Sequence, residues 1–381
     1  VGPHAIYRGG TGIKILKELG VQFSGGIPSA SGGYAVENGV KHALPGGFMS
    51  LVTTGLLGLP GKLETARLLG SLQKVDARAV QHLTVRQWLD TQIRQPDVRR
   101  LVQALFRVST YANSPELQSA GVAIDQLQIA LATNVLYVDG GWQTLVDGLR
   151  QAAGAAGVRI VSGVRVEAIA CDTAAQGVRL ADGTVHSASA VVIAAGPSEA
   201  AELMPSERNS TVQEWADASV PIKAACLDIA LSKLPRPRAT FALGIDHPLY
   251  LSVHSAVAKL APAGSATIHV AKYLDPDVPT DAKADERQLE DLLDLVQPGW
   301  RGLVVERRFL PNMVVYHALV TAAQGGWRGR PGPTVPNIPN LYVVGDWVGP
   351  EGLLADASLS SAKQAAQLIT RTPMLQAVAA A

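Results

Sequence analysis

The sequence predicts an α/β domain joined to an α+β domain that contains a helical part and an antiparallel sheet. Three patterns support this fold class: strands alternate with helices over residues 135–195, a strand, a loop and a helix follow one another over residues 341–369, and longer, partly polar strands occupy residues 222–274. With 47% apolar and 17% charged residues, the chain has the composition of a folded protein with a large core. Its 381 residues suffice for two or three domains of about 100 to 200 residues each.

The first third of the chain predicts a helix, a hairpin and then a helical region. Residues 11–19 have a short helical pattern that Gly20 ends. Within residues 34–44, Asn38 and Gly39 form the pair that a two-residue type I′ turn prefers, because both positions need a positive φ. From residue 48 to 131 the apolar residues recur at helical spacing, which predicts about four to six helices. The clearest apolar face is formed by Val98, Leu101, Val102, Leu105 and Phe106.

The middle of the chain predicts alternating strands and helices. Glycines and an Asp-Gly turn separate the expected elements, which are a strand over 135–138, a helix that ends at Gly157, a strand pair over 158–161 and 164–171, a hairpin turned by Asp182 and Gly183, and a strand over 190–195. Strands with one open face are expected over 222–274, then a helix over 281–296 and two strands up to residue 317.

The last part of the chain predicts a linker and a closing unit. Residues 324–340 contain four Gly and four Pro, so they are expected to form neither helix nor strand. An apolar strand over 341–345 then leads through a turn-rich loop to a helix over 354–369.

Charge and cysteine content exclude several classes of partner and site. A net charge of +1 gives no electrostatic basis for binding nucleic acid. Cys171 and Cys226 are the only cysteines, which excludes a disulfide framework and favours a cytoplasmic location. The longest apolar stretch, residues 48–60, is too short to span a bilayer, and we interpret it as a buried helix or, alternatively, as an apolar surface that touches a membrane.

Several catalytic motifs are absent from the sequence. It contains no Gly-x-Ser-x-Gly elbow, no His-x-x-x-His pair and no Cys-x-x-Cys, so serine hydrolysis and a dedicated metal site are not expected. The dinucleotide fingerprint Gly-x-Gly-x-x-Gly begins at Gly10 and Gly12, but Ile15 replaces its third glycine. The cradle that this motif forms for a pyrophosphate is therefore missing.

The closing unit is the most informative segment. Gly345, at the end of the strand, permits close approach of a ligand, and Asp346 would project a carboxylate into the crevice where open α/β sheets bind ligands. The helix that starts near Leu354 would direct its free N–H groups and positive dipole end at a negative group. The alternative is an ordinary strand and helix with an aspartate cap.

This unit resembles the carboxyl-terminal FAD motif of the flavin oxidoreductases that include phytoene desaturases and amine oxidases, and it is most similar to the bacterial phytoene dehydrogenase-like branch. The segments that match are GPHAIYRGG at residues 2–10, YVDGGWQTLVDGLRQAAGAAGVRIVSGVRVEAI at 137–169, AVVIAAGP at 190–197 and the closing unit at 340–369. In this family the strand, Gly-x-Gly-x-x-Gly and helix lie just upstream of the first segment. The resemblance therefore implies a Rossmann-like FAD-binding domain that is truncated at its amino terminus.

The resemblance also implies which residues contact FAD. Carried over to this sequence, Asp346 and Gly345 contact the ribityl and pyrophosphate part, and Val166 and the pair Ala195-Gly196 contact the adenine end. Leu354, Ala355 and Asp356 place a helix N-terminus at the pyrimidine edge of the ring, while Gly2, Pro3 and His4 lie beside it. The alternatives are a loop histidine for His4 and plain strand core for Val166 and Ala195. Lys223 falls near the region where amine oxidases carry a lysine, but a surface lysine is the preferred interpretation.

The resemblance implies three structural parts and a redox function. The FAD-binding domain would comprise residues 1–33, 135–220 and 331–381, with a helical part over 34–134 and a sheet part over 221–330. The expected activity is hydride transfer from a C–H of an apolar small molecule to flavin N5, as in desaturases, because Leu354 stands where amine oxidases usually have an aromatic residue and only 5% of residues are aromatic.

Several alternatives stay open beside this activity. They are an amine oxidase, a porphyrinogen oxidase-like enzyme, a flavoprotein without net oxidation, and a degenerate fragment without activity. No general base is evident, so the catalytic residues are unassigned. The oligomeric state is also open, as is peripheral contact with a membrane.

Overall fold

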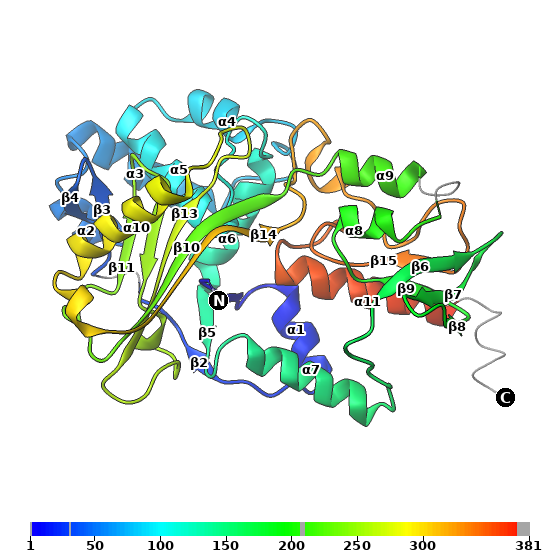
Figure 1. Ribbon diagram of the computed structural model, residues 1–381. Helices are drawn as coiled ribbons and strands as arrows, with labels where there is room; N and C mark the ends of the chain where they lie inside the picture. The colour runs from blue at the N-terminus through cyan, green and yellow to red at the C-terminus, as the bar shows by residue number, and fades with distance from the viewer. Residues whose placement is uncertain (1, 30–31, 206–209, 372–381) are drawn as a thin grey trace.

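The computed structural model describes residues 2–29, 32–205 and 210–371, and it divides into two halves (Figure 1). One half contains a seven-stranded sheet with helices on both faces, and the other contains small sheets with α1, α7 and α11 beside them. Among the described residues, no helix combines the length and apolar character needed to cross a bilayer.

The large sheet has the strand order β14-β10-β13-β12-β11-β3-β4. In that order its strands are Val304–Tyr316, Ile222–Leu231, Ala266–Tyr273, Leu249–Ser252, Phe241–Gly244, Tyr34–Glu37 and Val40–Ala43. All neighbours are antiparallel except β11 and β3. Along β10, Ala224 and Cys226 face one core while Ala225 and Leu227 face the other, so the strand is buried on both sides.

Helices cover both faces of this sheet. One face packs against a bundle of five helices: α2 (Phe48–Thr53), α3 (Leu59–Leu72), α4 (Val85–Gln92), α5 (Pro96–Thr110) and α6 (Ala120–Thr133). The opposite face is covered by α10 (Ala282–Val296), whose buried leucines pack on β10 and β13. The number of helices in the bundle agrees with the prediction.

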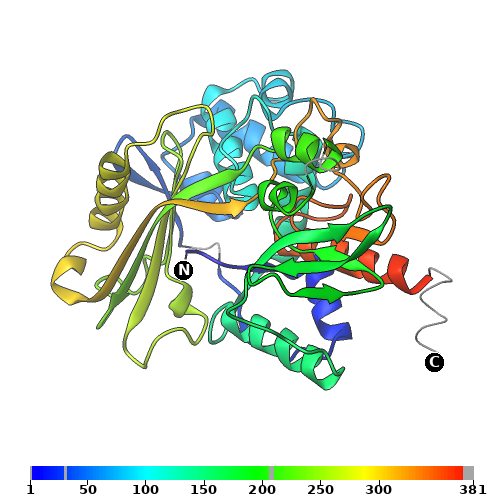
Figure 2. The ribbon, with the colours of Figure 1, turned by 45° about the vertical axis from the view of Figure 1, so that its right-hand side comes forward.

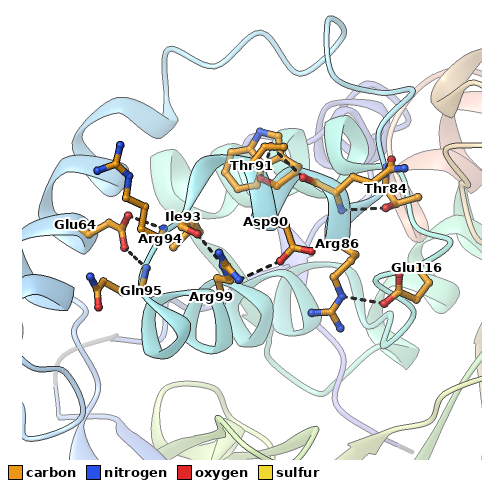
Figure 3. Close-up of polar contacts among 12 residues, drawn as sticks. Glu64, Thr84, Arg86, Asp90, Thr91, Ile93, Arg94, Gln95, Arg99 and Glu116 are labelled. Carbon is orange, nitrogen blue, oxygen red and sulfur yellow. Dashed lines mark hydrogen bonds and ion pairs between the residues drawn. The ribbon is translucent and has the colours of Figure 1, made fainter.

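Polar contacts fix the junctions of this bundle (Figure 3). Glu64 of α3 accepts the backbone N–H groups of Arg94 and Gln95, both at 2.8 Å, and thereby holds the turn between α4 and α5. At the start of α4, Thr84 and Gln87 form a reciprocal capping box. The bundle is therefore held by backbone caps as well as by its apolar core.

The other half is built from segments that are distant in sequence. Its helices are α1 (Thr11–Glu18), α7 (Gln143–Ala155), α8 (Pro197–Glu202), α9 (Ser210–Asp217) and α11 (Ala355–Arg371). Short 3₁₀ turns in the described part of the chain are η2 (His254–Ala256), η3 (Trp300–Leu303) and η4 (Gly326–Gly329). Its strands are β1 (Ile6–Tyr7), β2 (Gly25–Gly26), β5 (Val135–Val138), β6 (Val166–Cys171), β7 (Ala175–Leu180), β8 (Val185–Ser187), β9 (Val191–Ile193) and β15 (Leu341–Val343). The parallel pair β9 and β15 brings the ends of two segments about 150 residues apart side by side.

Local predictions are confirmed where turn chemistry or periodicity carried them. The hairpin β3–β4 turns at Asn38 and Gly39, with φ of 51° and 71°. The expected strand at 135–138, the helices at 11–19, 281–296 and 354–369, and the strand in the closing unit are all present. The linker contains no α-helix or strand, only the turn η4.

Three predictions of local structure are wrong. Residues 158–161 are exposed and form no strand, because no described segment pairs with them. The chain between α7 and β6 is therefore a coil (Figure 1). The two strands expected before residue 317 are the single strand β14, in which Pro311 is tolerated at the open edge of the sheet. Residues 48–60 do not form one buried helix: α2 ends at Thr53, and Phe48 and Met49 are 78% and 69% exposed.

Candidate active site

A cavity of about 360 Å³ lies between the two halves of the molecule, and we call it the central cavity. Its walls come from the amino-terminal segment, β10, β14, α7 and α11. Among its lining residues are Pro3, His4, Trp142, Met313, Asp346 and Leu354. Four of the predicted cofactor residues, Pro3, His4, Asp346 and Leu354, therefore meet at one cavity, and Ala355 is a fifth.

The start of α11 lies at this cavity. Leu354 has a left-handed backbone with φ of 56°, which is unusual for a residue with a branched side chain, and Gly352 before it has φ of 69°. Leu354 and Ala355 both line the cavity. The first turn of a helix has N–H groups without helical acceptors and carries partial positive charge, so this end of α11 can stabilise an electron-rich group in the cavity.

Asp346 lies at the carboxyl end of β15 and is held in place by two residues that the sequence did not single out. His317 approaches its carboxylate with Nδ1 at 3.1 Å from Oδ2 and with its backbone N–H at 3.3 Å from Oδ1. The hydrogen bond to Asp346 raises the pKa of His317, although partial burial opposes this. Arg330 donates to the carbonyl of Asp346 at 3.1 Å and to that of Gly352 at 2.9 Å, so it ties the strand end to the loop before α11.

The amino-terminal segment passes close to β10 and β14. Gly2 donates its N–H to Asp228 Oδ2 at 2.7 Å and has φ of 76°, and a Cβ there would lie 2.8 Å from the terminal methyl of Met313. The positive φ favours glycine at this position, whereas the flexible end of the Met313 side chain could move away from a Cβ. The ring of His4 stacks on Trp142 with centroids 5.2 Å apart, which orients it along the cavity wall.

The remaining predicted residues lie away from the central cavity. Ala195 and Gly196 follow β9, where the Ala195 carbonyl accepts the indole N–H of Trp347 at 3.0 Å. Gly345 lies at the neighbouring strand end and exchanges hydrogen bonds with Ser361 of α11. Val166 begins β6 in a separate sheet, and Lys223 on β10 does not line the cavity.

Asp356 is turned toward α1 rather than into the cavity. Its Oδ1 accepts the N–H of Gly12 at 2.6 Å, and its side chain is buried. Burial raises the pKa of Asp356 to about 6, and the hydrogen bond from Gly12 opposes that rise. Asp356 therefore joins the amino ends of α1 and α11.

Two further cavities adjoin the central one. An inner cavity of about 180 Å³ shares Ala5 and Tyr111 with it and extends toward α5, α6 and β11. No charged side chain is present among the described residues that line this inner cavity. An outer cavity of about 480 Å³ shares His4, Trp142 and Val146 with the central cavity and reaches exposed residues of the β5–α7 loop.

The central cavity fits the ring end of a flavin. Apolar side chains of α7 and β14 form its walls, and the amino end of α11 supplies N–H groups for an electron-rich ring edge. Gly2 lies beside it, at the outer cavity. Asp346 also lines the central cavity, and its carboxylate oxygens, on a side chain that is 14% exposed, can accept hydrogen bonds from hydroxyl groups.

Comparisons with known proteins agree with this geometry. Residues 12–226, more than half of the chain, match the model of the flavin containing amine oxidoreductase family. The structure is similar to an oxidoreductase from Methanosarcina mazei, with a TM-score of 0.71, 18% identity, and coverage of 96% of this chain and 86% of that one. It is also similar to cyclohexylamine oxidase from Brevibacterium oxydans, with a TM-score of 0.66, 15% identity, and coverage of 97% and 88%.

A third similar structure is putrescine oxidase bound to putrescine, with a TM-score of 0.67, 14% identity, and coverage of 94% and 85%. These identities establish the shared fold only. No curated protein sequence matches the chain. Because the family model covers more than half of its length, the chain belongs to the flavin containing amine oxidoreductases and is an FAD-dependent oxidoreductase.

Proposed function

We propose that the protein is a dehydrogenase that removes a hydride from a C–H of an uncharged, apolar substrate, as desaturases do. The observation that carries this proposal is the inner cavity, which touches the central cavity at Ala5 and Tyr111 and has no charged side chain among its described lining residues. An ammonium group entering it would lose its hydration without gaining a carboxylate partner, whereas a hydrocarbon would lose nothing. When bound, FAD supplies the oxidant for such a reaction.

We propose that the amino end of α11, Asp346 and the segment from Gly2 to His4 hold the flavin. Leu354 and Ala355 would present backbone N–H groups to the ring, and Asp346 would accept hydrogen bonds from ribityl hydroxyls. His317 and Arg330 would keep Asp346 and the preceding loop in position. For Ala195, Gly196 and Val166, contact with the adenine end stays a prediction.

Amine oxidation is the second candidate, and the aromatic residues of the inner cavity favour it. Only 5% of the residues are aromatic, yet five aromatic side chains line this cavity: Tyr7, Tyr111, Tyr137, Phe241 and Tyr250. Aromatic faces attract cationic and partly positive groups, so an amine could bind against them without a carboxylate.

The two candidates can be separated by anaerobic reduction of the FAD-loaded protein. Polyene precursors, amines and porphyrinogens would be added in parallel while the flavin absorbance is followed. Bleaching by the polyenes alone supports the dehydrogenase proposal, and bleaching by amines overturns it in favour of amine oxidation. Bleaching by none of them, or a protein that retains no FAD, would support the non-enzymatic alternative.

A variant sharpens this test. Leu131 lines the inner cavity and is half exposed, so Leu131→Glu should fold while placing a carboxylate at the cavity wall. We expect weaker reduction by an apolar substrate and stronger reduction by an amine, because the new charge favours ammonium. The matched control is Leu19→Glu, which changes an equally exposed leucine that lines none of the three cavities.

We also propose that a strand, a glycine-rich turn and a helix precede residue 1. Together with residues 1–33, 135–220 and 331–381, this segment would form one FAD-binding domain. The support is the apolar segment 158–164, where Val158, Ile160, Val161 and Val164 are each about half exposed and unpaired. Exposed apolar residues with strand patterning suit a missing sheet neighbour. Sequencing the coding DNA upstream of residue 1 tests this, and a stop codon or unrelated sequence there would contradict it.

Peripheral contact with a membrane is a further proposal. Phe48, Met49, Val52, Leu59 and Leu63 are exposed on α2 and α3, at the end of the molecule far from β6–β8 (Figures 1 and 2). No acidic residue occurs between residues 38 and 63, whereas Lys41 precedes the patch in the sequence and Lys62 lies within it. Apolar side chains bordered by lysine suit an anionic lipid surface, from which an apolar substrate could be taken.

A further inference from the structure

A group of buried hydrogen-bonding side chains separates the inner cavity from the outer cavity. Tyr137 and Tyr250 line the inner cavity, and Tyr137, His254 and His269 line the outer one. Tyr137, Tyr250 and His254 are only 4%, 5% and 3% exposed. Hydroxyl and imidazole groups can both accept and donate a proton, so this boundary can pass a proton from one cavity to the other.

The contacts within this group form a continuous connection. Tyr250 Oη lies 3.3 Å from His254 Nε2, and Tyr137 Oη lies 3.5 Å from Tyr250 Oη and 3.1 Å from Ser252 Oγ. The ring of Tyr137 stacks on that of His254 with centroids 3.7 Å apart. The hydroxyl of Tyr250 thus lies between the hydroxyl of Tyr137, which lines the inner cavity, and the imidazole of His254, which lines the outer cavity.

The surroundings of His254 favour a neutral imidazole, which is the form that can accept a proton. Burial lowers its pKa well below the usual value, and the nearby His269 and His4 lower it further. His269 lies 4.6 Å away between ring centroids and is itself bound to Asp228, with Nδ1 at 2.7 Å from Oδ1. Burial also raises the pKa of Tyr250, so its phenol is protonated at neutral pH.

A route to solvent exists on the far side. The outer cavity is bordered by Gly140, Gln143 and Val146, which are exposed. A proton placed on His254 can therefore reach water without passing back through the substrate cavity. The described residues that line the inner cavity include no charged side chain that could take up the proton.

We propose that Tyr250 and His254 form a relay that carries the proton lost by the substrate from the inner cavity to the outer cavity. This inference rests on the proposed function. One C–H bond of the substrate breaks and its electron pair leaves as hydride to the oxidised flavin, while the neighbouring C–H, or the N–H of an amine, loses its proton and a double bond forms. Tyr250 Oη accepts that proton as its own passes to His254 Nε2, while the other ring nitrogen gives up its proton toward the outer cavity, so the buried ring stays neutral. Exchange with water through the outer cavity then restores the starting tautomer.

The first test needs neither cofactor nor substrate. NMR of protein labelled with ¹⁵N in histidine, with the His254 signals assigned by their loss in His254→Gln, reports the charge and tautomer of the ring. The relay requires a neutral ring at pH 7 with Nε2 unprotonated, and Tyr250→Phe should shift that tautomer preference because the phenol donor is gone. An imidazolium at pH 7, or a proton on Nε2, would overturn the proposal, because Tyr250 could then not pass its proton on.

The second test uses the FAD-loaded enzyme and whichever substrate reduces it. Tyr250→Phe removes only the hydroxyl and should slow flavin reduction by about 100-fold, with loss of the solvent deuterium isotope effect and unchanged FAD binding. His254→Gln should do the same, and the matched control His247→Gln, at an exposed loop position, should not. Unchanged reduction in Tyr250→Phe would overturn the relay. If no substrate reduces the flavin, the proposed function fails while the NMR result still decides the relay.

Discussion

Asp356→Asn should stabilise the protein at neutral pH. The carboxyl group of Asp356 is buried between α1 and α11, where its Oδ1 accepts the N–H of Gly12 at 2.6 Å. A Cβ at Gly10 or Gly12 would contact the same carboxylate, so solvent has little room to reach it. An asparagine keeps an oxygen acceptor for Gly12 and has no charge to bury.

The size and sign of the effect follow from the pKa. Burial raises the pKa of Asp356 from 3.8 to about 6, so the folded protein binds this proton more tightly than the unfolded chain does. Its contribution to stability is therefore fully present below pH 3.8 and is lost as pH rises through about 6. The shift corresponds to about 3 kcal/mol. The amino ends of α1 and α11 favour the carboxylate by about 0.3 to 1 kcal/mol each, which reduces this cost without reversing it.

The assay is thermal unfolding of the wild type and the variant between pH 4 and pH 8. With an unfolding entropy of about 2.1 cal/mol/K per residue, 3 kcal/mol corresponds to about 4 °C for this chain length. We expect Asp356→Asn to melt higher than the wild type by up to about that amount at pH 8, with the gap closing at pH 4. The control Asp147→Asn, at an exposed position of α7, should show no such pH-dependent gap. A variant that melts lower than the wild type at pH 8 would refute the reasoning, since the two helix ends would then outweigh burial.

Three further predictions concern other parts of the molecule. Glu64→Ala should speed hydrogen exchange of the backbone amides at the α4–α5 turn by about 30-fold, because two hydrogen bonds of about 1 kcal/mol each are lost. Glu116→Ala, which removes an exposed ion pair, should leave exchange there unchanged. Phe48→Ser should reduce co-sedimentation with anionic lipid vesicles and Val305→Ser should not, although both residues are at least 70% exposed; equal binding would contradict the proposed membrane contact. Asp346→Asn should weaken FAD binding by about 10-fold, because a charged hydrogen-bond acceptor is lost. Flavin fluorescence measures this affinity, and an unchanged value would mean that the ribityl chain lies elsewhere.

Sequence patterns predicted the elements that depend on neighbours in the chain. The turn at Asn38 and Gly39 needs only two residues that tolerate positive φ, and the helices of the bundle need only their own periodicity. Residues 158–161 have the same apolar, β-branched character as a strand, but a strand also needs a partner, and none of the described segments provides one. The same limit applies to β14, whose length is set by pairing with β10 rather than by its own pattern.

The polar contacts of the site were harder to predict because they join segments with no common motif. His317 and Arg330 lie 29 and 16 residues before Asp346, and Arg330 comes from a stretch whose Gly and Pro content indicated only a linker. A partly buried arginine at such a position is informative only after the fold has placed it against the carbonyls that it binds.

Composition carries little information about the substrate site for a related reason. An aromatic content of 5% is an average over the chain, and it says nothing about where the aromatic residues gather. Half of the eight tyrosines line the inner cavity, from segments near residues 7, 111, 137 and 250. Two of them also contact each other and His254, so one cluster of side chains can both shape an uncharged pocket and accept a proton from it. A dehydrogenase that acts on an uncharged substrate needs both properties at one place, and Tyr137 and Tyr250 lie where they can provide both.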